Sequence, residues 1–226
     1  MGPRSNKKGT FASSVKASKL ERRKAVLTPG KSVLIVCEDS KASPDYFERF
    51  RKKLRLSTVN VEVCGEECGS DPKSVVDYTK GRKQSVETST RIDEYDNIFC
   101  VVDVDEHSSL GDAVQTARDN NICLVISNPC FEYWYILHFE KTGSSYNSRT
   151  ELYRKLTKHL KQQYDKSSCD FFDFIYPATQ TAIRNSKEIL SGQWHNEPDL
   201  RQCNPSTHVH RVVECIMDIA AKSRPL

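Results

Sequence analysis

The chain has 226 residues, of which 37% are hydrophobic and 28% are charged, with nine glycines and nine prolines. This composition is that of an ordinary globular protein, and it excludes collagen-like, fibrous and low-complexity chains. No apolar run approaches the roughly 20 residues that cross a bilayer, so we expect a cytoplasmic protein without membrane contact and with reduced cysteines.

The first segment, residues 1–31, is strongly basic. It holds nine basic residues against one acid, a charge of +8, and because the whole chain carries +4, the remainder carries −4. Such an arm either docks on a phosphate backbone or is a solvated terminus that aids solubility. Its candidate nucleic-acid contacts are Lys7, Lys8, Arg22, Arg23 and Lys24.

Residues 32–142 alternate short apolar runs with helical patterns, which predicts an α/β domain. Strands are expected at 32–37, 60–64, 97–105 and 122–126, and helices at 44–54, 71–83, 110–119 and 130–139. Pro44 and Pro129 each follow a residue that suits a helix cap, Ser43 and Asn128. The order of the elements predicts a mainly parallel, three-layer sheet with right-handed crossovers.

Residues 143–226 have a different, helical character. After a polar loop at 141–149, helices are expected at 150–164, 171–190 and 207–221. Ser206 or Thr207 suits the cap of the last helix. The chain thus divides into a basic arm, an α/β domain and a helical C-terminal region that packs on the sheet or forms one wall of a cleft.

Three acids lie where predicted strands end: Glu38 after the first, and Asp103 and Asp105 at the end of the third. The carboxyl ends of parallel strands meet at one edge of a sheet, and residues two apart in a strand point the same way. Close carboxylates repel each other, and Mg2+ or Mn2+ removes this conflict while leaving positions for phosphate oxygens. The alternative is that these acids cap helices or face solvent.

Other residues carry weaker signals. Glu132 is a possible catalytic residue, because an ionised acid in so apolar a helix needs a partner, either an arginine or the metal cluster. A structural salt bridge or a favourable place at the helix start also explains it. Cys64 and Cys68 lack the paired spacing of a zinc site. His208 faces either the cleft or solvent, and an ordinary surface histidine is the expectation. Arg211 is a candidate phosphate contact.

Two basic segments have aromatic neighbours, Arg49–Arg55 and Lys155–Lys161. Each either flanks a nucleic-acid groove or forms a solvated helix face, and the sequence does not separate these interpretations.

Four segments, VLIVCEDS, VVDVDEH, ISNPCFEYWYILHF and NPSTHVHRVVE, resemble in this order the RloB-like family, whose core is a Toprim-like fold. The resemblance implies a mainly parallel Toprim-like sheet sandwiched by helices, with a helical C-terminal cap. It implies that Glu38 acts as general acid/base or metal ligand and that Asp103 and Asp105 bind Mg2+. It further implies a metal-dependent nuclease of bacterial antiviral defence, commonly beside an AAA-type ATPase, that cleaves RNA such as tRNA, or DNA.

This chain departs from the family pattern near the expected site. Asp39 replaces a glycine, Ala42 and Ser43 replace a Thr-Glu pair, and Val104 replaces a basic residue. The departures keep a second hypothesis open, a non-catalytic Toprim-derived module that binds nucleic acid or an ATPase partner.

Overall fold

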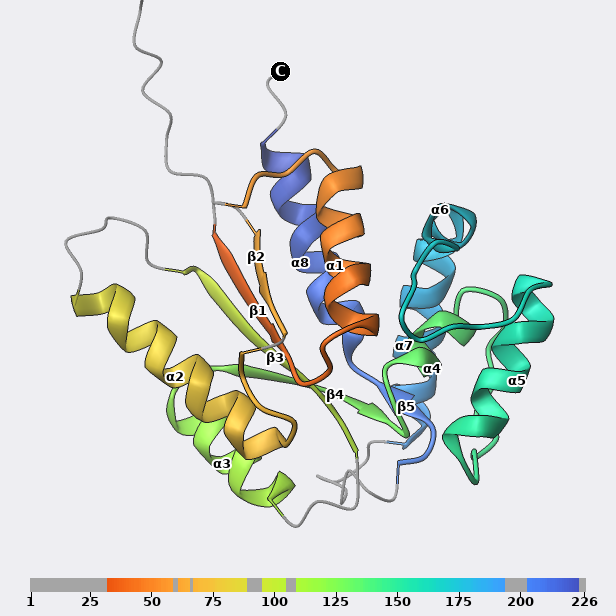
Figure 1. Ribbon diagram of the computed structural model, residues 1–226, viewed down its shortest axis with the longest axis horizontal. Helices are drawn as coiled ribbons and strands as arrows, with labels where there is room; N and C mark the ends of the chain where they lie inside the picture. Colours follow the sequence, from red (N-terminus) through yellow and green to blue (C-terminus); the bar gives the residue numbers. More distant parts are fainter. Residues whose placement is uncertain are drawn as a thin grey trace, which may run out of the picture.

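The computed structural model describes residues 32–58, 61–65, 67–88, 95–104, 109–193 and 203–223. Its centre is a five-stranded sheet in the order β2-β1-β3-β4-β5 (Figure 1). The parallel strands are β1 (Val33–Cys37), β2 (Val61–Cys64), β3 (Asn97–Asp103) and β4 (Cys123–Asn128). The short β5 (Ser206–Thr207) pairs antiparallel with β4. This mostly parallel sheet with flanking helices confirms the predicted α/β, Toprim-like fold class.

The central strands are apolar because both faces of the sheet are covered. Every residue of β1 is buried, and its side chains alternate between two cores. Ile35 packs with helices on one face, and Val36 packs with helices on the other. A strand covered on both sides reads as a continuous apolar run, which is the signal that made β1 and β3 predictable.

Helices form a layer on each face of the sheet (Figure 1). One layer consists of α2 (Pro72–Thr88) and α3 (Leu110–Asp119), and the other contains α1 (Ala42–Lys53) and α8 (Val209–Lys222). The aromatic face expected in the first helix is buried against this second core. Within the described residues, no helix has both the length and the apolar character needed to cross a membrane.

The remaining helices lie together on one side of the molecule (Figure 1). They are α4 (Glu132–Ile136), α5 (Arg149–Leu160), α6 (Phe172–Ile175), the 3-10 turn η1 (Tyr176–Ala178) and α7 (Thr179–Gln193). We call residues Phe131–Phe139, which contain α4, the aromatic wall. Its central side chains, Tyr133, Trp134 and Tyr135, are at most 1% exposed, which confirms that this apolar segment is buried.

The start of α1 differs from the prediction. The helix begins at Ala42, and Ser43 lies in its first turn instead of capping it. The carboxylate of Asp39 accepts the backbone N–H groups of Lys41 at 2.9 Å and Ser43 at 3.2 Å, and it also accepts the Ser43 hydroxyl. Asp39 therefore takes the capping role that was predicted for Ser43, at a helix start that lies two residues earlier than predicted.

Three other local predictions are also wrong. Asn128 ends β4, the Asn128–Pro129 peptide bond is cis, and α4 begins only at Glu132, so Asn128 caps no helix. The predicted helix 171–190 is divided into α6, η1 and α7. Ser206 and Thr207 form β5, although the Thr207 hydroxyl oxygen still accepts the N–H of Val209 at 3.3 Å.

Candidate active site at the carboxyl edge of the sheet

Glu38 and Asp103 meet where two neighbouring strands end. In the β1–β3 register, Cys37 lies opposite Val101, and the N–H of Glu38 donates to the Val101 carbonyl at 2.9 Å. The N–H of Asp103 in turn donates to Oε2 of Glu38 at 2.8 Å. The two acidic residues thus lie together at one edge of the sheet, as expected for the carboxyl ends of parallel strands.

The Asp103 carboxylate contacts both the aromatic wall and α5. Its Oδ1 accepts the N–H of Phe131 at 2.9 Å, and its Oδ2 lies 3.4 Å from Nη2 of Arg149. Burial raises the pKa of Asp103 well above its ordinary value, the charge of Glu132 raises it further, and the Arg149 guanidinium lowers it. Glu38 and Asp39 also raise this pKa, so one arginine faces an excess of negative charge.

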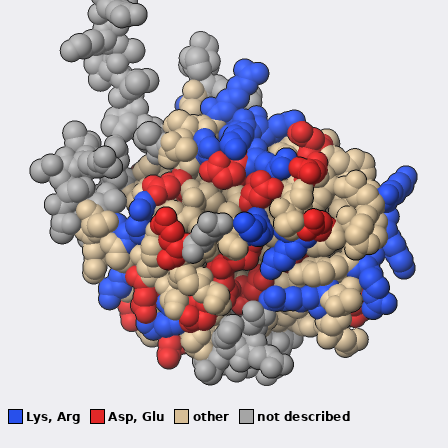
Figure 2. Space-filling model, viewed as in Figure 1, with Lys and Arg blue, Asp and Glu red and all other residues tan. Residues whose placement is uncertain are grey.

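A hollow of about 450 Å³ opens beside Glu38. We call it the acidic hollow, and its lining residues are Glu38, Asp39, Ser40, Lys41, Gly65, Gly69, Ser70 and Lys166. Figure 2 shows acidic side chains gathered near the middle of the face drawn, with basic side chains to their right. Gly65 is required here, because a Cβ atom would lie 2.6 Å from Cγ of Pro44. A larger residue would push the loop after β2 away from the start of α1.

The two family departures beside the acids have structural explanations. Both carboxylate oxygens of Asp39 accept hydrogen bonds from the first turn of α1, so this residue is already used as a helix cap. Val104 packs against the core beneath α2 and α3, and its N–H donates to the Ser127 carbonyl at 2.8 Å. Neither departure removes the Glu38–Asp103 junction.

Glu132 is buried behind this junction and does not line the acidic hollow. Its side chain is 1% exposed, and its Oε1 accepts the hydroxyl of Tyr164 at 3.1 Å. The charge of Glu132 adds to burial in raising the pKa of Cys130, Tyr153 and Tyr164. Glu132 therefore acts on Asp103 through its electric field, while its hydrogen bond to Tyr164 belongs to the packing of α4 against the loop that follows α5.

A family model described as RloB-like protein matches residues 33–216, from β1 into α8. This chain belongs to the RloB-like family. Comparisons with curated proteins and with solved structures give no significant match. The matched span of this RloB-like chain contains Glu38, Asp103, Asp105 and Glu132.

The donor set of the RloB-like chain fits a hard divalent cation. Glu38 and Asp103 offer carboxylate oxygens, and the pKa of Asp103 is raised first by burial and then by the neighbouring negative charges, which a cation would offset. Mg2+ is usually held by one or two carboxylates together with water and phosphate oxygens, so these two acids suffice as its protein ligands. The third acid predicted for this site, Asp105, lies outside the described residues.

Several other predicted site residues lie elsewhere. Arg211 lies beside Cys123, the first residue of β4, and so at the opposite end of the sheet from Asp103. His208 is 5% exposed, which corrects the expected surface position, and burial lowers its pKa to about 3. The arm residues Lys7, Lys8, Arg22, Arg23 and Lys24 lie outside the described residues.

The weak zinc pattern finds no support in the described ranges. Cys68 donates its thiol to the Cys37 carbonyl at 2.9 Å, and burial raises the pKa of Cys64 and of Cys68 to about 11. In the part of the chain that the structure describes, no three His, Cys, Asp or Glu side chains are placed to hold a metal ion together. No disulfide links the cysteines of these ranges.

The structure adds two residues that sequence reasoning missed. Lys166, in the loop between α5 and α6, lines the acidic hollow together with Glu38. More than half of the chain separates these two residues in the sequence. Arg149 opens α5 and contacts Asp103. Neither lies in a motif, because both reach the site only through the packing of the C-terminal helices.

Proposed function

We propose that this protein is a divalent-metal-dependent endonuclease of the Toprim type, which hydrolyses RNA or DNA in bacterial antiviral defence. The observation that carries the proposal is the Glu38–Asp103 junction at the edge of the sheet. Family membership supports the reaction class, and the resemblance supports an AAA-type ATPase as partner.

Glu38 and Asp103 would hold Mg2+ or Mn2+, which would polarise the phosphodiester and activate water when bound. The chain positions these two acids rigidly, because the Asp103 N–H fixes one oxygen of Glu38 and the Phe131 N–H fixes one oxygen of Asp103. Glu38 lines the hollow, so its carboxylate would either complete the metal shell or accept a proton from the attacking water. Lys166, which also lines the hollow, would neutralise a phosphate oxygen of the substrate.

The proposal is tested by cleavage of labelled RNA and DNA with Mg2+ or Mn2+, compared with a chelator. We expect Glu38→Gln and Asp103→Asn each to reduce cleavage by about 100-fold or more, as losses of acid–base groups or metal ligands do. Glu38→Gln retains an oxygen that accepts the Asp103 N–H, so its melting temperature should stay close to that of the wild type.

Glu67→Gln is the matched control. Glu67 follows β2 at the same edge and accepts the Tyr78 hydroxyl at 2.8 Å, but it does not line the hollow. Its cleavage rate should be that of the wild type. Wild-type cleavage by folded Glu38→Gln and Asp103→Asn variants would refute the assignment of the site.

A non-catalytic nucleic-acid-binding or adaptor module is the second candidate, and the Arg149–Asp103 contact favours it. An arginine held against Asp103 would take the place of a cation. Titration with Mn2+ followed by its electron paramagnetic resonance separates the two candidates independently of cleavage. The nuclease proposal predicts bound Mn2+ that is lost in Glu38→Gln, whereas the module predicts no binding and no effect of the substitution.

A further inference from the structure

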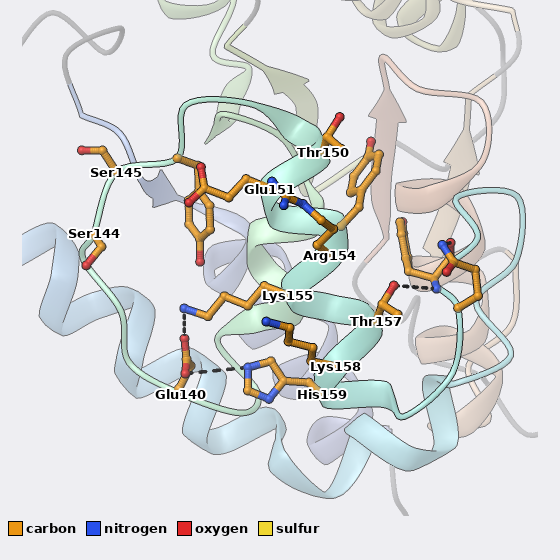
Figure 3. A pocket seen from close by; sticks show the side chains of 14 residues that line it. Glu140, Ser144, Ser145, Thr150, Glu151, Arg154, Lys155, Thr157, Lys158 and His159 are labelled. Atoms are coloured by element: carbon orange, nitrogen blue, oxygen red, sulfur yellow. Dashed lines mark hydrogen bonds and ion pairs between the residues drawn. The ribbon is translucent and has the colours of Figure 1, made fainter.

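A second hollow, of about 900 Å³, extends along α5, between this helix and the segments 140–146 and 163–164 (Figure 3). We call it the α5 groove. Its lining combines tyrosines with basic side chains, and those that matter here are Tyr146, Tyr153, Tyr164, Arg154, Lys155 and Lys158.

Two cations of the α5 groove lack an ion-pair partner among the described residues. Arg154 and Lys158 are exposed and lie one helical turn apart, and neither forms an ion pair with any residue in the described ranges. Like charges at this spacing destabilise a helix. Their presence on one exposed face therefore points to an anionic ligand outside the chain.

The other charged side chains of the groove have hydrogen-bond or ion-pair partners within the protein. Lys155 pairs with Glu140 and lies over the Tyr146 ring, 5.7 Å from its centroid. Figure 3 shows Lys155 reaching Glu140, which His159 also contacts. Glu151 accepts the N–H of Asn147 at 3.2 Å near the start of α5. Counting Glu140 and Glu151 against Arg154, Lys155 and Lys158, the lining of the groove carries a formal charge of +1, and Arg154 and Lys158 are its cations without an ion pair among the described residues.

The basic segment of α1 provides a comparison, because its arginine and lysine form ion pairs within the protein. Arg49 and Lys53 have the same spacing as Arg154 and Lys158. Arg49 binds Asp45 at 3.0 Å and Asp170 at 2.9 Å, and Lys53 binds Asp173 at 2.6 Å. These ion pairs tie α1 to the loop before α6 and to α6 itself, so this pair of cations serves the fold.

The α5 groove adjoins the candidate active site. Arg149, the first residue of α5, contacts Asp103, and Tyr153 follows one turn later on the same helix. The rings of Tyr153 and Tyr164 lie 5.1 Å apart, and the Tyr164 hydroxyl contacts Glu132 behind Asp103. A polymer whose phosphate reaches Asp103 can therefore continue along α5.

We propose that the α5 groove binds a single-stranded segment of nucleic acid next to the phosphate that is cleaved. Arg154 and Lys158 lie about 6 Å apart along the helix axis, and each would contact one phosphate of an extended strand. The tyrosines of the groove would provide surfaces on which bases stack. The inference takes its ligand class from the proposed nuclease function, but binding is measured without cleavage.

The test is fluorescence anisotropy of a labelled 20-nucleotide single strand, RNA or DNA, in chelator at several salt concentrations. We expect the double variant Arg154→Gln/Lys158→Gln to bind about tenfold more weakly and to lower the salt-dependence slope by about 1.4, since two phosphate contacts are lost. Arg49→Gln/Lys53→Gln removes the same charge at the same spacing and should leave both quantities unchanged. Glu38→Gln should bind as the wild type does.

Unchanged binding by Arg154→Gln/Lys158→Gln would overturn the proposal, as would an equal loss in Arg49→Gln/Lys53→Gln, which would indicate unspecific attraction. A duplex that binds as tightly as the single strand, with the same dependence on Arg154 and Lys158, would overturn the assignment to single strands. If Arg154→Gln/Lys158→Gln loses binding while folded Glu38→Gln still cleaves normally, strand binding in the groove is supported and the assignment of the active site to Glu38 is refuted.

Discussion

The acidic hollow and the aromatic wall both place a glutamate near Asp103, but the two glutamates differ in their access to solvent. Glu38 lines an open hollow of about 450 Å³, whereas Glu132 is 1% exposed and bound to the Tyr164 hydroxyl. The hollow is open to a substrate, and the wall is part of the core. A carboxylate in the wall is therefore expected to govern stability, and a carboxylate in the hollow to govern activity.

The largest expected effect on the wall is its response to acid. Burial lowers the pKa of His138, in the wall, from 6.5 to about 4, and outside the wall it lowers the pKa of His210 to about 4 and that of His208 to about 3. Between pH 6.5 and about 4, the unfolded chain binds protons that the folded chain does not, so the free energy of unfolding falls as the pH falls. The loss is about 1 kcal/mol per pH unit for each histidine.

Chemical denaturation at a series of pH values from 4 to 9 measures this dependence. We expect His138→Phe to make the decline below pH 6.5 less steep by about one proton, because phenylalanine does not titrate. Between pH 7 and 9 the difference in stability between the two proteins should be constant, which serves as an internal control. An unchanged slope below pH 6.5 would show that His138 is not buried as a neutral ring.

A smaller effect is expected from the hydrogen bond that holds Glu132. Tyr164→Phe removes the hydroxyl that donates to the Glu132 carboxylate and should lower the free energy of unfolding by about 2 kcal/mol, since the acceptor is buried and charged. Tyr133→Phe is the matched change at a neutral acceptor, the Thr142 carbonyl at 2.6 Å, and should cost about 1 kcal/mol.

Urea denaturation at neutral pH measures both variants. In the Tyr164→Phe background, Glu132→Gln should recover part of the loss, because a neutral amide is less costly to leave unsatisfied than a carboxylate. Equal losses in the two Tyr→Phe variants would contradict a charged Glu132 in the wall.

The elements of the hollow and the wall were largely predictable, because burial leaves a local signal. The run 32–37 indicated a strand covered on both faces, and the apolar helix after Pro129 indicated a buried element. Helix starts were not predictable in the same way. Ser43 and Asn128 have the chemistry of caps, but Asp39 takes that role for α1, and Asn128 continues β4.

The candidate site was predictable only where strand geometry fixes it. Glu38 and Asp103 follow strands whose pairing brings their ends together, so their proximity follows from a parallel sheet. Arg149 and Lys166 reach the same edge through the packing of α5 and the loop after it, which no local pattern encodes. The same limit applies to the two basic helices, because only tertiary contacts distinguish the paired cations of α1 from those of α5.

The smallest effect is expected from substitution of Asp39, which tests whether both acids of the hollow are needed for cleavage. Asp39 lines the hollow, but its oxygens accept hydrogen bonds from the first turn of α1. Asp39→Ala should therefore lower the free energy of unfolding by about 1 kcal/mol, the usual cost of losing a helix cap. Asp39→Asn keeps an acceptor oxygen, so it should retain both stability and most of the cleavage. If Asp39→Asn instead lost cleavage as severely as Glu38→Gln while remaining folded, Asp39 would belong with the metal-binding acids, because only the charge of the side chain would have been removed.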